Sequence, residues 1–266
     1  MTDAAVTLAI DDGVAAITLD QPERRNALSH EMAGEIHESL EAITDSDARV
    51  VVLEGAGSAF SAGGDIAAME ERLEAESVDL QAVTDHIVER TGRAIAEVYE
   101  CGIPTIAVVD GPAFGAGAAL AIAADVVLAS DRAQISFGFR QVGLGVDAGT
   151  SFLLARIVGE TDALDLVYTG DLVGAERSER LGLFTHVYDE VAFDEKVDAY
   201  IDHVADGPTI GLRASKRSIQ KGLTAGSIRE AIQAEADAQA AVLDTRDHRE
   251  GVEAFLEKRA PEFEGR

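Results

Sequence analysis

Two glycine-rich turns constrain the fold of this chain more than any other feature of its sequence. The first covers residues 60–65 and the second residues 111–117, and each lies between a short apolar run and a segment with helical character. A turn at a helix N-terminus leaves backbone N–H groups unpaired and adds the positive end of the helix dipole. Both turns are therefore predicted to offer amide donors to an anion or a developing oxyanion. Either turn alone would more often be structural.

The second turn does not match the fingerprint of a dinucleotide-binding loop. Gly115 and Gly117 are followed by Leu120 where a third glycine is expected, and the turn does not belong to a first strand–helix unit. Neither turn carries the lysine of a phosphate-binding P-loop. Nucleotide binding through either kind of loop is therefore not expected.

Hydrophobic periodicity predicts strands that alternate with helices along most of the chain. Strands are expected at residues 6–10, 14–19, 49–54, 105–109 and 126–129. The first two, joined by a turn at residues 11–13, are predicted to form a β-hairpin. Helices are expected after Ser29, a candidate N-cap, over the second half of 66–99, and at 118–124 and 150–158. This alternation indicates an α/β core. Strand signals cease near residue 206, and helices are expected at 209–222, 228–243 and 249–258. We expect a core at 1–205 and a helical C-terminal region at 206–266 that serves oligomerisation.

The charge balance excludes one class of partner. The chain has 49 acidic and 22 basic residues, which gives a formal net charge of −27. Such a surface repels phosphate backbones, so nucleic-acid binding is not expected. The acidic residues are spread along helical segments, which is typical of a solvated exterior. Concentrated salt would screen their mutual repulsion, so the composition predicts a halophilic source.

Cysteine and histidine usage point to a reducing compartment and to a site without metal. Cys101 is the only cysteine, so no internal disulfide can form, and the six histidines show no metal-ligand spacing. No N-terminal signal sequence and no apolar stretch long enough to span a membrane is evident. These features predict a cytoplasmic protein with no membrane partner.

Four segments together resemble the enoyl-CoA hydratase/isomerase, or crotonase, family. They are residues 21–29 (QPERRNALS), 59–66, 106–119 with the following Ala124-Asp125, and 142–159, in the family's order and spacing. The resemblance covers nearly the whole chain. It implies a crotonase-like spiral core of ββα units, an acyl-CoA thioester as substrate, no cofactor beyond that coenzyme A, and a homotrimer or homohexamer.

The resemblance also assigns residues to the site. The backbone N–H groups of Gly64 and Ala116 match the pair that binds the thioester oxygen, and fixed donors of this kind stabilise an enolate in a water-poor site. Phe139 and Tyr99 are candidates for the acyl pocket. The residues that match the coenzyme A pocket are Arg25, Ala27, Leu28, Ala62, Asp65 and Ile66.

The acid–base residues separate this chain from typical hydratases of the family. Their two glutamates match Ala119 and Gln141, and neither residue can titrate. Asp147 instead matches the working acid of the family's isomerases and of 4-chlorobenzoyl-CoA dehalogenases. Without that match, an aspartate before a helix is more often a cap.

The resemblance therefore favours enoyl-CoA double-bond isomerisation, with Asp147 as acid and base. Three alternatives stay open. The first is an enoyl-CoA hydratase with non-standard acids. The second is a hydrolase resembling the dehalogenases, although their histidine and tryptophan match Gly92 and Phe139. The third is a non-catalytic member that binds coenzyme A or RNA.

Overall fold

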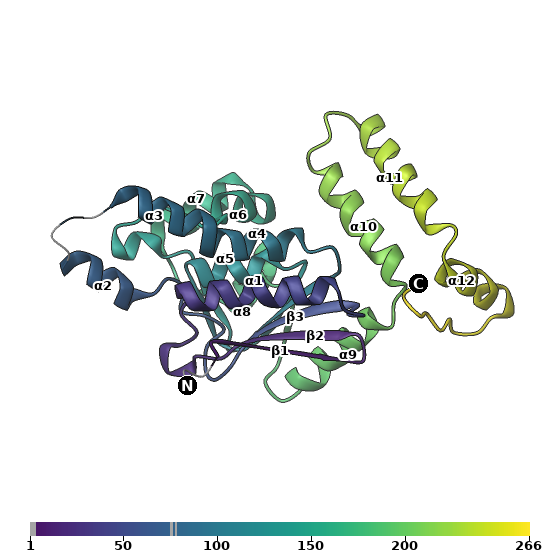
Figure 1. Ribbon diagram of the computed structural model, residues 1–266, viewed down its shortest axis with the longest axis horizontal. Helices are drawn as coiled ribbons and strands as arrows, with labels where there is room; N and C mark the ends of the chain where they lie inside the picture. Colours follow the sequence, from purple (N-terminus) through teal and green to yellow (C-terminus); the bar gives the residue numbers. More distant parts are fainter. Residues whose placement is uncertain (1–3, 75–76, 78) are drawn as a thin grey trace.

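The computed structural model describes residues 4–74, 77 and 79–266 and has a mixed α/β fold (Figure 1). The strands are β1 (Val6–Asp11), β2 (Val14–Leu19), β3 (Val50–Gly55), β4 (Thr105–Val109), β5 (Pro112–Phe114), β6 (Val126–Ser130), β7 (Gln134–Ser136), β8 (Val173–Gly174) and β9 (His186–Tyr188). The α-helices are α1 (His30–Thr44), α2 (Ile66–Glu74), α3 (Leu80–His86), α4 (Arg93–Glu100), α5 (Ala116–Ala123), α6 (Thr150–Val158), α7 (Glu160–Thr169), α8 (Ala175–Leu181), α9 (Phe193–Ala205), α10 (Thr209–Gly222), α11 (Ile228–Val242) and α12 (Arg246–Glu257). Two 3₁₀ turns, η1 (Pro22–Arg24) and η3 (Phe139–Val142), and a π-helical turn, η2 (Ile87–Gly92), complete the elements. Among the described residues, no helix is long and apolar enough to cross a membrane.

A six-stranded sheet forms the centre of the molecule, in the order β1-β2-β3-β4-β6-β9. The β1–β2 pair is antiparallel, and the other pairs are parallel. The predicted hairpin is confirmed, because Asp12 (φ 43°) and Gly13 (φ 77°) form a two-residue turn between β1 and β2. Positive φ at both turn residues suits the right-handed twist of the strands that they join.

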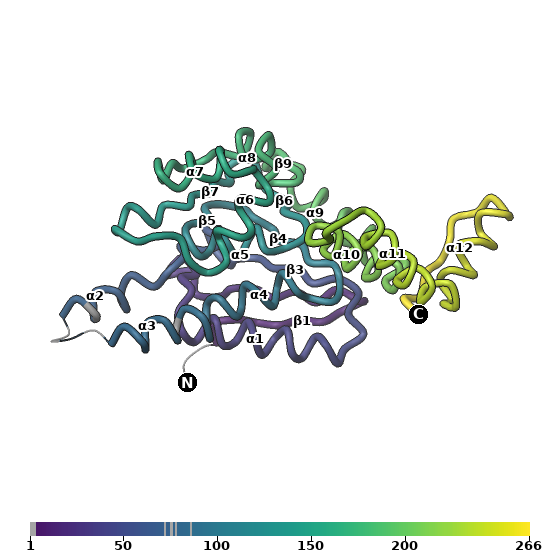
Figure 2. The backbone as a smooth tube through the Cα atoms, turned by 90° about the horizontal axis from the view of Figure 1, so that it is seen from above, coloured from purple at the N-terminus to yellow at the C-terminus, as the bar shows by residue number. Residues whose placement is uncertain are grey.

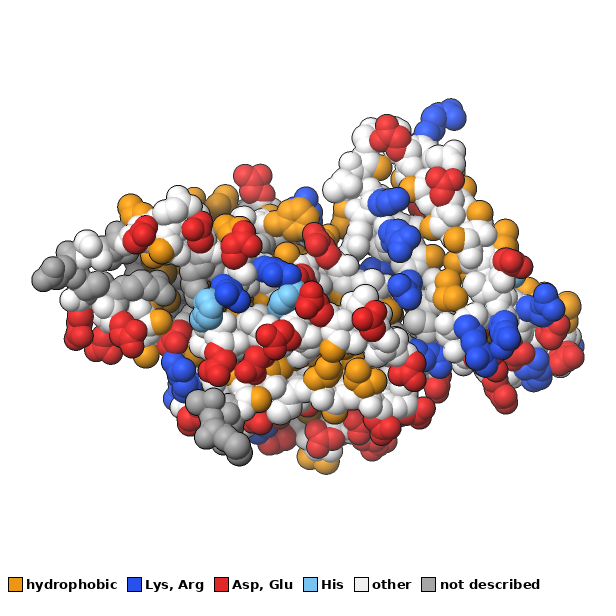
Figure 3. All heavy atoms as spheres, in the orientation of Figure 1, with side chains coloured by type: hydrophobic (Ala, Val, Ile, Leu, Met, Phe, Trp, Pro, Cys, Tyr) orange, Lys and Arg blue, Asp and Glu red, His pale blue; other side chains and the backbone are white. Residues whose placement is uncertain are grey.

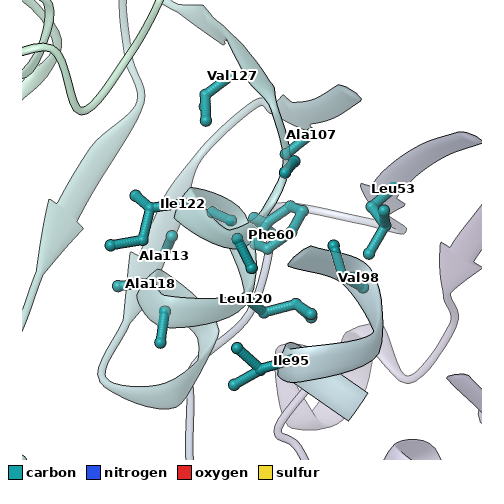
Figure 4. Close-up of a cluster of buried hydrophobic side chains, with 14 of the residues drawn as sticks. Leu53, Phe60, Ile95, Val98, Ala107, Ala113, Ala118, Leu120, Ile122 and Val127 are labelled. Carbon is teal, nitrogen blue, oxygen red and sulfur yellow. The ribbon is translucent and has the colours of Figure 1, made fainter. Parts of the chain in front are cut away.

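Each face of this sheet is covered by different helices. The register places Ile17, Leu53, Ala107 and Val127 in one row across the sheet, and their side chains belong to the larger core cluster. Figure 4 shows part of this cluster around α5. The alternate residues of the same strands, such as Ile106, pack in a second cluster against α9. The near-continuous apolar strands of the sequence are thus explained by burial on both faces.

A second, small sheet lies beside the first, in the order β5-β7-β8. The sequence did not predict it, because its strands have only two or three residues and carry no periodicity that can be recognised. Strand β5 lies inside the second glycine-rich turn. As a result α5 begins at Ala116, two residues before the predicted start.

Helices α10, α11 and α12 form an arm that projects from the sheet and its covering helices (Figures 1 and 2). The predicted bounds of α10 are confirmed, whereas α12 begins at Arg246, earlier than predicted, because the Thr245 hydroxyl accepts a hydrogen bond from the His248 N–H and caps the helix. Lys216 of α10 anchors the arm through an ion pair with Asp125, at 2.8 Å. The proposed boundary between residues 205 and 206 stays a prediction.

Candidate active site

The two glycine-rich turns lie directly against each other. The Phe114 N–H donates to the Ser61 carbonyl at 2.9 Å, and Ser61 and Ala113 form a parallel bridge. Gly63 has φ +83°, and a Cβ added there would lie 2.3 Å from the Phe114 carbonyl oxygen. Only glycine fits at this position, because the backbones approach closely and the left-handed conformation disfavours side chains. The contact brings the end of the first turn beside the start of α5.

The N–H groups of Gly64 and Ala116 have no hydrogen-bond partner within the described part of the chain. Ala116 is the first residue of α5, whose eight residues are all buried, so its N–H is one of the unpaired donors of a helix N-terminus. Gly64 lies in the first turn, two residues before α2 begins at Ile66, so its N–H belongs to the turn and not to the helix. Two unpaired amides beside one cleft are the kind of donors that an oxyanion hole needs.

Gly64 and Ala116 both line a cleft of about 770 Å³. Its lining residues come from the two turns, from the starts of α1 and α2, from α3 and η2, and from the loop before α6. Charged residues in the lining are Arg24, Glu31, Asp65 and Asp147. A cleft of this size and mixed character is typical of a small-molecule site.

Asp147 lines the cleft together with Gly64 and Ala116, as a half-buried carboxylate. Its side chain has no hydrogen-bond or ion-pair partner among the described residues. Burial raises the pKa of this carboxyl above its ordinary value of 3.8, because desolvation disfavours the charged form. The alternative role as a helix cap is not realised: the N-cap of α6 is Gly149, and no side chain caps that helix.

The two positions where hydratases of the family carry glutamate hold no acid. Ala119 is fully buried in α5 and does not line the cleft. Gln141 lines the cleft, but its amide nitrogen donates to the Gly170 carbonyl at 3.0 Å. Asp65, a second carboxylate of the lining, is held by Arg24 at 2.7 Å and accepts hydrogen bonds from the first turn of α2. Asp147 is thus the lining aspartate that is not engaged elsewhere.

The residues predicted for the coenzyme A pocket divide into two groups. Four of them line the cleft: Leu28, Ala62, Asp65 and Ile66. Arg25 and Ala27 do not, and Arg24 takes the place expected for Arg25. The reason lies in the backbone, because Arg25 and Asn26 both have positive φ values and the chain turns sharply there. The Arg25 carbonyl instead accepts the Ala62 N–H at 2.8 Å.

The two aromatic residues predicted for the acyl pocket also have different places. Phe139 lines the cleft, and its ring lies near Gly115 of the second turn. Tyr99 does not line the cleft, so its assignment is corrected. Its ring packs edge to face on Phe152 of α6, with ring centroids 5.5 Å apart. The buried face of α4 points into the core here and directs Tyr99 towards α6 instead of the cleft.

Two buried polar residues that support the site were not singled out in the sequence. The Asn26 amide donates to the carbonyls of Ala56 and Ala59, both at 2.9 Å, and accepts the Gln21 N–H at 3.0 Å. The Ser61 hydroxyl donates to the Asn26 carbonyl at 2.7 Å and accepts the Gly63 N–H at 3.2 Å. Both residues have no exposed surface. The sequence did carry a signal for both residues, because each is a polar residue within an otherwise apolar or glycine-rich turn.

Comparison with known proteins identifies the class to which this fold and cleft belong. The sequence pattern of the enoyl-CoA hydratase/isomerase family matches residues 9–266. The chain belongs to this family, and its crotonase-like fold is shown by solved structures. An enoyl-CoA hydratase from Bacillus anthracis, 28% identical, superimposes with a TM-score of 0.90 over 98% of this chain and 100% of that one.

Some relatives of this chain are named as hydratases and others as isomerases. A Rhodobacter capsulatus protein named as a probable enoyl-CoA hydratase is 38% identical over 97% of this chain and 96% of its own length. The 1,2-epoxyphenylacetyl-CoA isomerase of Escherichia coli is 32% identical over 97% of each chain. Membership of the family is therefore firm, and the reaction has to be argued from the residues of the cleft.

Proposed function

We propose that this enzyme moves the double bond of an enoyl-CoA thioester. The thioester oxygen binds between the N–H groups of Gly64 and Ala116, and Asp147 removes a proton from the acyl chain. The resulting enolate is stabilised by the two amides, and the same carboxyl returns the proton at another carbon. No metal or redox group enters such a proton shuttle, and coenzyme A enters only as part of the substrate.

One observation carries the proposal: the cleft is lined by two residues with unpaired amides and by a half-buried carboxylate that no side chain in the described part of the structure engages. One carboxyl suffices for a shuttle, because it alternates between base and acid. The raised pKa of Asp147 suits this role, since the protonated form becomes accessible nearer to neutral pH. The Escherichia coli relative is also named as an isomerase of an acyl-CoA, although the substrate in its name is an epoxide.

Hydration of a 2-enoyl-CoA is the second candidate, and the name of the Rhodobacter capsulatus relative favours it. Hydration needs one group to activate water and one to protonate carbon. Ala119 and Gln141 can do neither. Hydration would therefore require Asp147 to do both, or Glu31 to act as its partner from the start of α1.

Three substrates separate the candidate reactions. Purified protein in concentrated salt is incubated with a 3-enoyl-CoA, a 2-enoyl-CoA and a 4-halobenzoyl-CoA, and products are followed by absorbance and mass. We expect conversion of the 3-enoyl-CoA to its 2-enoyl isomer without a change in mass. Gain of one water by the 2-enoyl-CoA, with no isomerisation, would support the hydratase. Binding of all three without turnover would support a non-catalytic family member.

We also propose that the C-terminal arm associates with further copies of the chain, giving a trimer or hexamer. Helix α11 buries none of its residues, and it exposes Ile228 (77%) and Ile232 (54%). Helix α10 buries only Thr209. Helices of this length are marginal unless they bury an apolar face, so the arm needs a covering surface. Figure 3 shows basic side chains gathered over α10, which could meet the acidic surface of another copy.

Light scattering on the full-length protein tests this association. The unmodified chain is expected to have the mass of a trimer or hexamer at micromolar concentration. The double substitution Ile228→Glu and Ile232→Glu should lower that mass, because two charges would enter the buried contact. Val191→Glu is the matched control, since Val191 is 97% exposed outside the arm. A monomeric unmodified protein would refute the proposed role of the arm.

A further inference from the structure

One helical segment along the cleft has an unusual backbone that has no part in the proton shuttle. Helices α3 and α4 are joined by the π-helical turn η2 without a break. Gly92 ends this turn, and a Cβ there would lie 2.6 Å from the Ile87 carbonyl oxygen. The glycine therefore permits the wide turn. Single π-helical turns are rare and occur often at functional sites.

The π-helical turn keeps a stripe of side chains in line. In a regular α-helix, residues four apart drift steadily around the axis, and the wider π-helical turn reverses part of that drift. Val83, Ile87 and Thr91 all line the cleft, while their described neighbours on the same segment are mostly exposed. Ile95 continues the stripe into the core, and it lies against Gly149 of the loop that carries Asp147.

The stripe therefore runs outward from the neighbourhood of Asp147. From Thr91 to Val83 it extends about 12 Å along the helix axis, at the usual rise per residue. Other lining residues are also apolar: Val142 from η3, Leu144 and Val146 from the loop before α6, and Met69 from α2. The charged lining residues other than Asp147 come from different elements, namely η1, the start of α1 and the loop before α2.

We infer that Val83, Ile87 and Thr91 form the wall that selects the acyl group, and that the substrate carries a medium-length hydrocarbon chain. This inference rests on the proposed function for the location of the thioester. A chain that starts between the two amides and passes Asp147 meets the stripe next. Each methylene buried there contributes to affinity by the hydrophobic effect. A short or charged acyl group would leave this apolar wall in water.

Binding of saturated acyl-CoA thioesters to the full-length protein tests the wall without requiring turnover. A fully buried methylene is worth about fourfold in affinity, so the four additional methylenes of octanoyl-CoA contribute up to about 250-fold. Because burial need not be complete, octanoyl-CoA is expected to bind at least about 30-fold more tightly than butanoyl-CoA in calorimetry. Ile87→Trp should remove most of this difference, because the larger side chain would occupy the space beside the wall that the longer acyl chain needs. The affinity for butanoyl-CoA should be unchanged. Val88→Trp is the matched control, because Val88 is 57% exposed and does not line the cleft.

A second variant covers the case in which the tryptophan disturbs folding. Ile87→Ala enlarges the same wall and should shift the preference towards dodecanoyl-CoA. Equal affinities for butanoyl- and octanoyl-CoA in the unmodified protein would overturn the inference, as would equal weakening of both ligands by Ile87→Trp. A chain-length preference without isomerisation of any enoyl-CoA would support the inferred acyl wall and refute the proposed reaction.

Discussion

Replacement of Asp147 by asparagine is expected to lower the rate of double-bond migration at least about 100-fold. General acid–base catalysis by one group contributes roughly 10²- to 10⁴-fold, and no other aspartate of the cleft is unengaged. The substitution keeps the shape of the side chain, so affinity for a saturated acyl-CoA should be unchanged. Stopped-flow absorbance and calorimetry measure the two effects separately.

The same substitution has a predicted signature in stability that excludes unfolding as the cause. Burial raises the pKa of Asp147, so the folded state binds this proton more tightly than the unfolded state does. Proton binding by this carboxyl stabilises the folded state fully below the unfolded pKa, near 3.8. This stabilisation is lost as the pH rises through the raised pKa of the folded state. Asp147→Asn should therefore melt at the same or a higher temperature than the unmodified protein at pH 7. Full activity in this variant would contradict the proposed role.

Replacement of Gly63 by alanine is expected to destroy the proposed oxyanion hole and to destabilise the protein by about 2–5 kcal/mol. A side chain in the left-handed conformation costs roughly 1–2 kcal/mol, and overpacking adds about 1–3 kcal/mol. The added methyl would meet the Phe114 carbonyl and force the two turns apart. Denaturant unfolding and the isomerisation rate measure the two losses.

Gly64→Ala is the control for this substitution. Gly64 does not have a positive φ, and an added Cβ would meet only the terminal methyl of Met69, which can move. The N–H of residue 64 is retained in the variant. Stability close to that of the unmodified protein, with much of the activity, is the expected result. If Gly63→Ala proved as mild as Gly64→Ala, the close approach of the two turns would not support the site.

Much of the fold could be predicted because local signals agreed with one another. The Asp12-Gly13 turn, the Ser29 cap and the apolar strands all pointed to one α/β arrangement, and the structure confirms each of them. The small sheet β5-β7-β8 could not be predicted, because its short strands are stabilised by tertiary contacts rather than by their own sequence. The same holds for the early start of α5, which depends on β5.

The sequence placed best those candidate residues that lie in turns with a recognisable motif. Gly64, Ala116 and Asp147 line one cleft, since each lies in a turn with a recognisable motif. Side-chain directions were less predictable. Because Arg25 and Asn26 have positive φ values, Arg24 lines the cleft where Arg25 was expected. Tyr99 packs on Phe152 instead of reaching the cleft. Neither outcome can be read from residue type or spacing alone.

A crystal structure with a bound, unreactive acyl-CoA analogue tests the central claim most directly. If the account is correct, the carbonyl oxygen of the analogue lies within about 3.1 Å of the amide nitrogens of both Gly64 and Ala116. The Asp147 carboxylate should then face the carbons between which the proton moves, and the acyl chain should lie along Val83, Ile87 and Thr91. A carbonyl oxygen bound away from both amides, or an acyl chain that leaves Asp147 facing water, would contradict it.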